Sequence, residues 1–322
     1  MALYTRLTGE ELAEAAGRFG LPPPERALPE PKGGVNTNYH LWAGGRRWFL
    51  RLAEGKSDAD VEFEARVLSF LEAARYPAVR LVLAADGRSH VRVRGRQAML
   101  FAHAPGEELA REAVGPAHCR QVGEMLGLLH RLAPEFGGDR PNPFGPHRVG
   151  RWIDELEPDG RGDEAVKRAL PMLRDELARA GTLPESPRGL VHGDLFIDNV
   201  LWAAGRVSAL LDWEMACVDA FAYDLAVALN AWCYGDRFQG DRARALLDGY
   251  RLHARLDQRT RAALLPQARY AALRFTASRI HGYHLAELGE DRLARKDWSR
   301  YRDRLAALRA LGEAGFRALL GE

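Results

Sequence analysis

The stretch LVHGDLFIDNVLW, residues 190–202, places a histidine, two aspartates and an asparagine inside a run of large apolar residues. Apolar residues on both sides predict short buried strands, which fix the backbone so that the polar side chains between them converge. Asp194 and Asn199 are separated by four residues, and a second acid, Asp212, follows the largely apolar run 207–211 in LLDWE. The order is therefore acid, amide, short hairpin, acid.

Phosphoryl transfer from ATP needs this set of side chains. One carboxylate orients the attacking hydroxyl and accepts its proton, and another holds the Mg²⁺ that bridges the phosphates. Mg²⁺ favours oxygen ligands and shares its coordination shell with phosphate and water, so a neutral asparagine oxygen can complete the shell. The stretch therefore predicts an ATP- and Mg²⁺-dependent phosphotransferase site.

A second feature lies in the N-terminal half. RRWFLRL, residues 46–52, is predicted to be a strand that points Arg51 into the interior. In the helix predicted from Asp58 to about Ala74, Glu64 falls within an apolar stripe, and a buried charge demands a partner. We expect Arg51 to pair with Glu64 and to be aimed at the α- and β-phosphates of a nucleotide.

The pattern along the chain predicts an α+β protein with two lobes. A β-hairpin over 33–52, with a turn at Gly44 and Gly45, precedes a helix and several short strands. Beyond HAPGEEL the pattern becomes helical, with helices expected at 116–132, 163–180, 222–234, 241–255, 258–286 and 298–319. The expected division is a small β-rich N-terminal lobe, residues 1–102, and a larger, mainly helical C-terminal lobe, residues 103–322.

Composition argues against several classes of protein. The 46 basic and 44 acidic residues are interspersed, which does not favour binding to nucleic acid or a membrane surface. We see no apolar run of about 18 residues and no secretion signal. Cys119, Cys217 and Cys233 form no CxxC pair and are expected to be core residues in a reducing cytoplasm.

These parts, in this order, resemble the kinase-like phosphotransferases, which include the aminoglycoside phosphotransferases and choline kinase. The resemblance extends from Gly33 to about His284 and is carried by the HxDxxxxN pattern with its downstream acid. GGVNTNYHL, HGDLFIDNV, ACVDAFAYDLAVALNAWC and AALRFTASR further resemble the bacterial type II homoserine kinase family. That family implies a two-lobed protein-kinase-like fold and phosphorylation of L-homoserine by MgATP, on the path to threonine.

The resemblance implies roles in catalysis and metal binding. Asp194 corresponds to the catalytic base, and Asn199 and Asp212 correspond to the metal ligands. His192 and Asp224 are expected to brace the catalytic loop rather than to transfer protons. Two features depart from the family: the metal segment reads DWEMA where DFYFA is expected, which adds Glu214 as a second potential ligand, and the nucleotide strand carries arginine where lysine is usual.

The same resemblance implies contacts with the nucleotide and the acceptor. The nucleotide residues would be the Arg51–Glu64 pair, the polar turn with Gly33, Gly34, Asn36, Thr37 and Asn38, and a hinge whose backbone pairs with adenine, formed by Met99, Leu100, Phe101 and Ala102. An amino-acid acceptor needs an arginine for its carboxylate and an acid for its ammonium. The candidates are Arg274, Arg279 and Asn230 for the first, Asp198 or Asp219 for the second, and Trp213 as a further contact.

Other acceptors stay open at this point, namely an aminoglycoside, choline, hydroxylysine or methylthioribose. The arginine-rich C-terminal region argues against a polycationic aminoglycoside. A nucleotide-binding pseudokinase is the rival from another class, although the three residues Asp194, Asn199 and Asp212 occur together. We expect a cytoplasmic monomer or homodimer whose partner is a small amino-acid-like alcohol, with no nucleic acid and no membrane.

Overall fold

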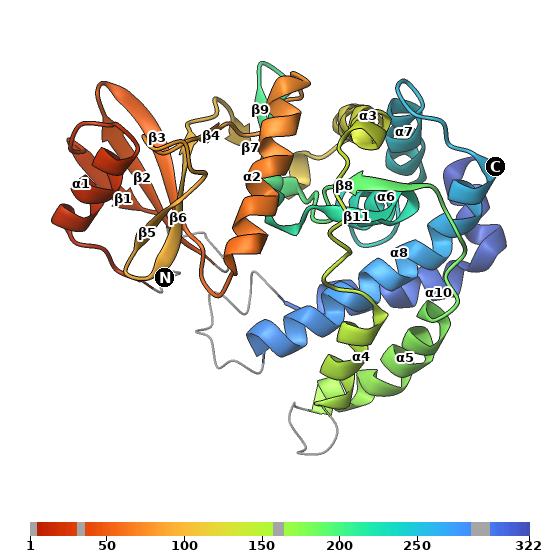
Figure 1. Ribbon diagram of the computed structural model, residues 1–322. Coiled ribbons are helices and arrows are strands. Elements are labelled where there is room, and N and C mark those ends of the chain that lie inside the picture. The colour runs from red at the N-terminus through yellow and green to blue at the C-terminus, as the bar shows by residue number, and fades with distance from the viewer. Residues whose placement is uncertain (1–4, 31–35, 157–163, 285–296) are drawn as a thin grey trace. The chain divides into compact units, whose positions relative to one another are not determined.

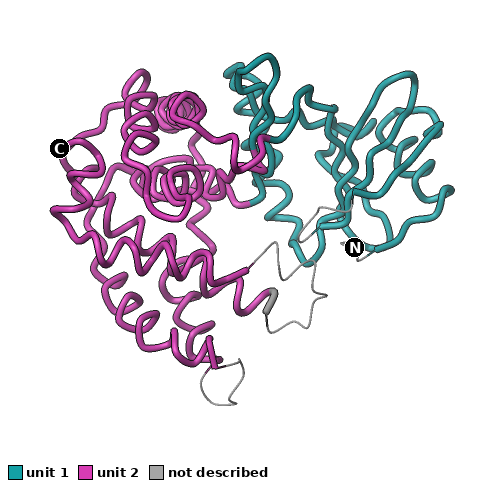
Figure 2. The backbone as a smooth tube through the Cα atoms, turned by 180° about the vertical axis from the view of Figure 1, so that it is seen from behind, with its two compact units in different colours: residues 1–108, 200–214 teal, residues 109–199, 215–322 magenta. Residues whose placement is uncertain are grey.

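A computed structural model describes residues 5–30, 36–156, 164–284 and 297–322. The chain forms two compact units, and each is described by itself (Figure 2). Unit 1 contains Met1–Glu108 and Val200–Glu214, and unit 2 contains Leu109–Asn199 and Met215–Glu322. The division into functional lobes after residue 102 stays a prediction.

Unit 1 is built on an antiparallel sheet with strand order β1-β2-β3-β6-β4, in which β5 also pairs with β6 (Figure 1). Helix α1 packs one face through Leu12 and Ala15, which share a core with Leu50 and Leu100. The expected hairpin with its Gly44–Gly45 turn is confirmed, and a capping box of Thr8 and Glu11 begins α1. The elements are α1 (Gly9–Arg18), β1 (Arg26–Pro29), β2 (Thr37–Ala43), β3 (Arg46–Leu52), α2 (Asp58–Ala73), β4 (Leu81–Val82), β5 (Val91–Val93) and β6 (Arg96–Ala102).

A second, smaller sheet completes unit 1 with residues from two parts of the chain. Strand β7 (Glu107–Glu108) pairs with β9 (Val200–Ala203), which pairs with β10 (Arg206–Leu210). The amide of Val79 donates to the carbonyl oxygen of Leu210 over 3.0 Å, so β10 is also joined to the N-terminal segment. This sheet brings Asp212, directly after β10, into the same unit as Arg51.

Unit 2 is mainly helical. Helix α8 is buried along most of its length, and α6 and α10 pack against it (Figure 1). Helices α3 and α7 meet backbone to backbone at Gly123 and Gly249, where a Cβ would lie within 2 Å of a carbonyl oxygen of the other helix. The helices are α3 (Pro116–Leu132), α4 (Pro146–Asp154), α5 (Glu164–Ala180), α6 (Phe221–Trp232), α7 (Gly240–Tyr250), α8 (Gln258–Arg279) and α10 (Ser299–Leu320).

Short elements connect these helices. They are the 3₁₀ turns η1 (Arg111–Ala113), η2 (Ala133–Glu135), η3 (Ile197–Asn199) and η4 (Trp213–Met215), the π-helical turn η5 (Ile280–His284), and the strand pair β8 (Arg188–Val191) and β11 (Cys217–Ala220). Three elements differ from the sequence expectations. Helix α4 is additional to the expected helices, β1 precedes the hairpin expected over 33–52, and β11 is additional to the expected strands. The predicted end of the 258–286 helix lies outside the described residues.

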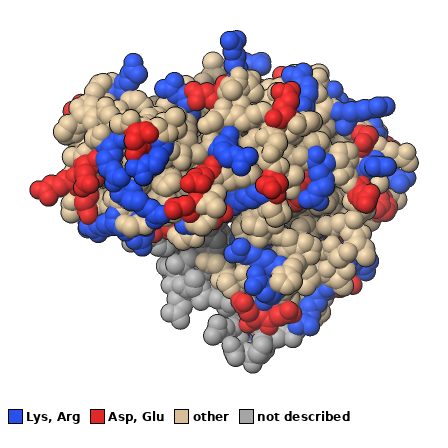
Figure 3. Space-filling model, viewed as in Figure 1, with Lys and Arg blue, Asp and Glu red and all other residues tan. Residues whose placement is uncertain are grey.

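The distribution of surface charge and the burial of the cysteines were both predicted from the sequence. On the face shown in Figure 3, basic and acidic side chains are interspersed. The three cysteines are free and buried, as the sequence predicted. Within the described ranges, we find no helix that combines the length and apolar character needed to span a bilayer.

Candidate active site

The HGDLFIDN segment forms a tight loop in unit 2. It follows β8 and ends in η3. The side-chain nitrogen Nδ2 of Asn199 donates to the carbonyl oxygen of Asp194 over 2.7 Å, and the amide of Phe196 donates to the same oxygen over 2.8 Å. Gly193 has φ +74°, and a Cβ there would lie 3.1 Å from the carbonyl oxygen of Met215. The loop therefore holds Asp194 and Asn199 in a defined relation.

Asp224, in the first turn of α6, binds the backbone of this loop through hydrogen bonds. Its carboxylate accepts hydrogen bonds from the amides of His192 and Gly193, each over 2.8 Å, and lies 3.2 Å from Nε2 of His130. Burial alone would raise the pKa of Asp224, but the hydrogen bond from His130 and the charges and amides around it lower that pKa below its ordinary value. Tyr250 contacts the other ring nitrogen of His130 over 3.1 Å. Both Asp224 and His192 are fully buried, in keeping with the bracing role predicted for them.

Arg274 lies next to the predicted base. Its Nη1 is 3.8 Å from Oδ1 of Asp194, and its side chain is only 4% exposed. The guanidinium stacks on Phe275 at 3.8 Å and on Phe144 at 4.2 Å from the ring centroids. Its Nε is buried and makes no hydrogen bond within the described part of the chain. The structure thus brings together Asp194 and one of the arginines predicted to bind an acceptor.

In unit 1, the predicted pair of Arg51 and Glu64 is confirmed. Arg51 of β3 donates through Nη2 to Glu64 of α2, and both side chains are buried. Nη1 of Arg51 lies 3.6 Å from Oδ1 of Asp212. Burial opposes the charge of Arg51, but the negative charges of Glu64, Glu214 and Asp212 raise the pKa of the guanidinium above its ordinary value. Arg51 therefore links the sheet, α2 and the segment after β10.

The carboxylates after β10 differ in their suitability for a metal ion. The side chain of Asp212 is 39% exposed, and its backbone has φ +59°, a left-handed conformation that is uncommon for a residue other than glycine. Glu214 is buried, accepts a hydrogen bond from Asn36 over 2.7 Å and lies 3.9 Å from Nζ of Lys56. Asp212 and the amide oxygen of Asn199 are oxygen donors of the kind that Mg²⁺ takes. The contacts of Glu214 with Asn36 and Lys56 instead fit a structural carboxylate.

The predicted nucleotide residues are distributed over the sheet of unit 1. Asn38, Arg51 and Met99 lie in register on β2, β3 and β6, so they share one face. Asn38 is buried, and its Oδ1 makes no hydrogen bond in the described residues. Thr37 is buried and bonds Glu54 over 2.8 Å. Gly33 and Gly34 lie outside the described residues.

The predicted adenine hinge differs from the structure. Leu100 and Phe101 pair on one side with β3 and on the other with β4, and the amide of Ala102 donates to Arg80 over 2.9 Å. Backbone groups used by two neighbouring strands are not available to pair with a base. The stretch from Met99 to Ala102 is therefore strand rather than hinge, and because the amide of His103 still donates to Arg47 of β3 over 3.3 Å, the backbone leaves the sheet after His103.

Two of the predicted acceptor contacts, Trp213 and Asn230, are buried in the cores of their units. Trp213 is fully buried, packs against Tyr76 in unit 1 and donates to the carbonyl oxygen of Leu210, so the predicted substrate contact is not supported. Asn230 is fully buried in α6, where it donates to Ala268 of α8 over 2.8 Å. The large apolar surface of Trp213 explains its position, whereas the Oδ1 of Asn230 makes no hydrogen bond in the described residues.

The two acids predicted to bind the ammonium group of the acceptor differ in exposure. Asp198 is exposed on the catalytic loop. Asp219 lies on β11, where it accepts a hydrogen bond from Asn142 over 2.7 Å and has Arg188 at 3.5 Å. The ion pair with Arg188 makes Asp219 less suited to an ammonium group than Asp198.

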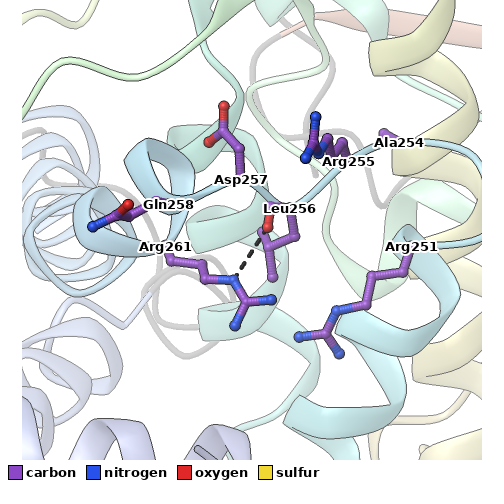
Figure 4. A pocket seen from close by; sticks show the side chains of 7 residues that line it. All are labelled: Arg251, Ala254, Arg255, Leu256, Asp257, Gln258 and Arg261. Carbon is purple, nitrogen blue, oxygen red and sulfur yellow. Dashed lines mark hydrogen bonds between the residues drawn. The ribbon is translucent and has the colours of Figure 1, made fainter.

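A pocket of about 510 Å³ lies at the N-terminal end of α8 (Figure 4). Its lining residues are Arg251, Ala254, Arg255, Leu256, Asp257, Gln258 and Arg261. Arg261 donates to the carbonyl oxygen of Leu256 and pairs with Glu322, and Arg251 pairs with Asp248. The pocket contains none of the predicted site residues.

Residues 28–258 match the phosphotransferase enzyme family. The chain belongs to that family. This phosphotransferase is 34% identical over 298 residues to a homoserine kinase from Phenylobacterium zucineum, with 90% of each chain covered. It is 32% identical to a homoserine kinase from Gluconacetobacter diazotrophicus, with 96% of this chain and 97% of the other covered.

A solved structure shares the fold of this phosphotransferase. The structure of an amicoumacin kinase in complex with AMP-PNP, Ca²⁺ and Ami superposes with a TM-score of 0.68 at 17% identity, and 88% of each chain is covered. The predicted α+β, protein-kinase-like fold class is therefore confirmed, as is the predicted family. The activity implied by the family is transfer of a phosphoryl group to a hydroxyl.

Sequence reasoning missed two contributors to these sites. Lys56 lies in a glycine-containing turn between β3 and α2, where a lone lysine is indistinguishable from a surface residue. His130 lies on α3, and its apolar neighbours predict only a core position. The one signal in the sequence for His130 was a titratable residue among apolar residues near the end of a predicted helix.

Proposed function

We propose that this phosphotransferase transfers the γ-phosphoryl group of ATP to the side-chain hydroxyl of L-homoserine, forming O-phospho-L-homoserine. The observation that carries the choice of acceptor is the proximity of Arg274 to Asp194. Four bonds separate the hydroxyl oxygen of homoserine from its carboxylate carbon, a span of about 5 Å when extended. A hydroxyl at Asp194 would therefore leave the carboxylate within reach of a guanidinium that begins 3.8 Å away.

The charge of Arg274 also distinguishes among acceptors. A buried guanidinium beside the base attracts a carboxylate and repels the cationic groups of choline or an aminoglycoside. The homoserine kinases among the curated relatives support the same choice. The ammonium of homoserine would be met by an acid, for which Asp198 on the exposed side of the loop is our candidate.

The catalytic roles that we assign rest on the family resemblance and are supported by contacts within each unit. Asp194 orients the hydroxyl and accepts its proton, while the bond from Asn199 to the Asp194 carbonyl keeps the loop in shape. The oxygens of Asn199 and Asp212 would hold Mg²⁺, which when bound neutralises charge on the phosphates. The Arg51–Glu64 pair would position the α- and β-phosphates, and the backbone after His103 would contact adenine.

The test is ADP release with MgATP and L-homoserine, beside choline, serine, methylthioribose and kanamycin, in the wild type and in Asp194→Ala. We expect homoserine-dependent turnover that the substitution abolishes. Turnover with another acceptor alone would overturn the substrate. Stabilisation by nucleotide without ADP production from any acceptor would support a pseudokinase instead.

A further inference from the structure

Phe144 is an aromatic residue of unit 2 whose ring contacts Arg274. It lies in PNPFGP, residues 141–146, in the connection between η2 and α4. The guanidinium carbon of Arg274 lies 4.2 Å from the ring centroid of Phe144 and 3.8 Å from that of Phe275. Phe275 is the chain neighbour of Arg274 on α8, whereas Phe144 comes from another part of the chain. Tertiary structure therefore brings the second ring to this guanidinium.

The segment that carries Phe144 is anchored by several hydrogen bonds. The amide of Val218 on β11 donates to the carbonyl oxygen of Arg140 over 2.7 Å, and Nδ2 of Asn142 donates to Asp219 over 2.7 Å. The amide of Phe144 donates to Oδ1 of Asn142 over 2.8 Å. Fixing an irregular segment costs conformational entropy, which these bonds offset. The position of the Phe144 ring is thus defined by its surroundings.

A further bond joins Phe144 to α8, the helix that carries Arg274. The hydroxyl of Tyr270 donates to the carbonyl oxygen of Phe144. Burial raises the pKa of this hydroxyl, so it stays protonated and remains a donor. Tyr270 and Arg274 are four residues apart in α8 and therefore lie on the same face of the helix. The backbone and the ring of Phe144 thus contact successive turns of one helix face.

Core packing alone does not account for the position of Phe144. Its side chain is only partly buried, and so is that of Trp152 on α4, whose ring lies 5.7 Å away. Arg274 is buried, and its Nε makes no hydrogen bond within the described ranges. An aromatic ring attracts the charge of a guanidinium without occupying its N–H donors. The rings therefore hold Arg274 while leaving donors for an anionic ligand.

We propose that Phe144 is a positioning residue for the acceptor, because its ring fixes the guanidinium of Arg274 where it meets the acceptor's carboxylate. This inference rests on the proposed function, in which that carboxylate belongs to homoserine. A long arginine side chain loses rotamer freedom when it binds a ligand, and ordering it beforehand strengthens binding. Phe144 acts through Arg274, so its ring should affect the binding of a carboxylate more than the chemical step.

The first measurement is steady-state kinetics with homoserine and with the aminopropanol that has a hydrogen in place of the carboxylate. Phe144→Leu keeps an apolar side chain but removes the ring, and Phe144→Tyr keeps the ring. Tyr270→Phe removes only the hydroxyl that holds the Phe144 carbonyl, and it tests the same contact where Phe144→Leu folds poorly. The matched control is Phe238→Leu, in the turn between α6 and α7, where the Phe238 ring lies 4.9 Å from that of Tyr234.

We expect Phe144→Leu to raise KM for homoserine about tenfold, the order of a desolvated cation–π contact, and to change kcat by less than about threefold. Tyr270→Phe should raise this KM about threefold, since the ring is loosened rather than lost. Phe144→Tyr and Phe238→Leu should keep the KM of the wild type. For the aminopropanol, every variant should keep KM within about twofold, because no carboxylate is bound.

A second measurement needs no substrate. In nitrogen-labelled protein, the Nε–H signal of Arg274 is identified by its absence from the spectrum of Arg274→Lys. Ring currents should shift this signal upfield in the wild type. Phe144→Leu should move it downfield, and Phe238→Leu should leave it unchanged.

The two measurements separate the possible failures. An equal rise in KM for homoserine and the aminopropanol, or no rise for either, would overturn the positioning role of Phe144. An Nε–H signal that does not respond to Phe144→Leu would overturn the contact with Arg274. If the wild type turns over no homoserine, the proposed function fails and the role toward the carboxylate fails with it, even where the Nε–H signal responds.

Discussion

Replacement of Arg274 by methionine separates recognition of the acceptor from assistance to the base. Arg274 is buried between Phe144 and Phe275, so methionine can occupy the same apolar space. If the guanidinium binds the carboxylate of homoserine, its loss removes charge-assisted hydrogen bonds worth about 3 kcal/mol in total. At ~1.4 kcal/mol per factor of ten, kcat/KM for homoserine should fall about 150-fold.

The assay compares homoserine with an aminopropanol that lacks only its carboxylate. For this analogue, Arg274→Met should change kcat/KM by less than about threefold, since no carboxylate bond is lost. Arg259→Met, at an exposed position of α8, is the matched control and should leave both acceptors unaffected. An equal loss for homoserine and for the analogue would refute carboxylate binding and would show that Arg274 acts through Asp194, which it approaches to 3.8 Å.

Three further predictions follow from the same contacts. Asp224→Asn should lower the free energy of unfolding by about 2–4 kcal/mol in urea titrations, because it weakens buried hydrogen bonds to the catalytic loop. Folding lowers the pKa of Asp224, so its carboxylate stabilises the fold above the ordinary pKa of 3.8, and this stabilisation is lost as the pH falls below that value. Between about pH 5 and about pH 3, the Asp224→Asn variant should therefore lose less stability than the wild type. Gly193→Ala and Gly205→Ala both place alanine at a left-handed φ, at a cost of about 1–2 kcal/mol. Only at position 193 would the added Cβ lie 3.1 Å from a carbonyl oxygen, so only that variant should also lose turnover. Equal turnover in the two variants would contradict the close approach. Asp212→Asn should raise the Mg²⁺ concentration needed for half-maximal turnover about tenfold or more, whereas Glu214→Gln should mainly lower the unfolding midpoint; a large Mg²⁺ effect in the second variant would reassign Glu214 as a ligand.

Local patterns in the sequence predicted the parts of the site that depend on periodicity. Glu64 stands on the apolar stripe of its helix, and a buried acid requires a cation on a neighbouring element, which Arg51 supplies. The apolar residues around the HxDxxxxN pattern similarly predicted that its polar side chains converge, and Asn199 lies against the carbonyl oxygen of Asp194. Both inferences span few residues or adjacent elements, so the geometry follows from the spacing.

The relation between Arg274 and Asp194 could not be derived in this way. The two residues are far apart in the chain, and their contact depends on how α8 packs against the catalytic loop. The adenine hinge was placed at Met99–Ala102 from the family resemblance, and the residues of β6 themselves do not show that this backbone pairs with two strands. Pairing with β4 uses the backbone of Leu100 and Phe101, and the side chains of these two residues do not predict this pairing.

The sharing of residues 200–214 with the first 108 residues has a consequence for biosynthesis. The chain leaves unit 1 after Glu108, forms the catalytic loop in unit 2, returns to supply β9, β10 and Asp212, and then departs again. When only about the first hundred residues have emerged from the ribosome, the three-stranded sheet is therefore incomplete, because β7 lacks its partner strand β9. The three-stranded sheet of unit 1 cannot be completed before the catalytic loop has been synthesised, so the final step in folding unit 1 requires part of unit 2 to have been made.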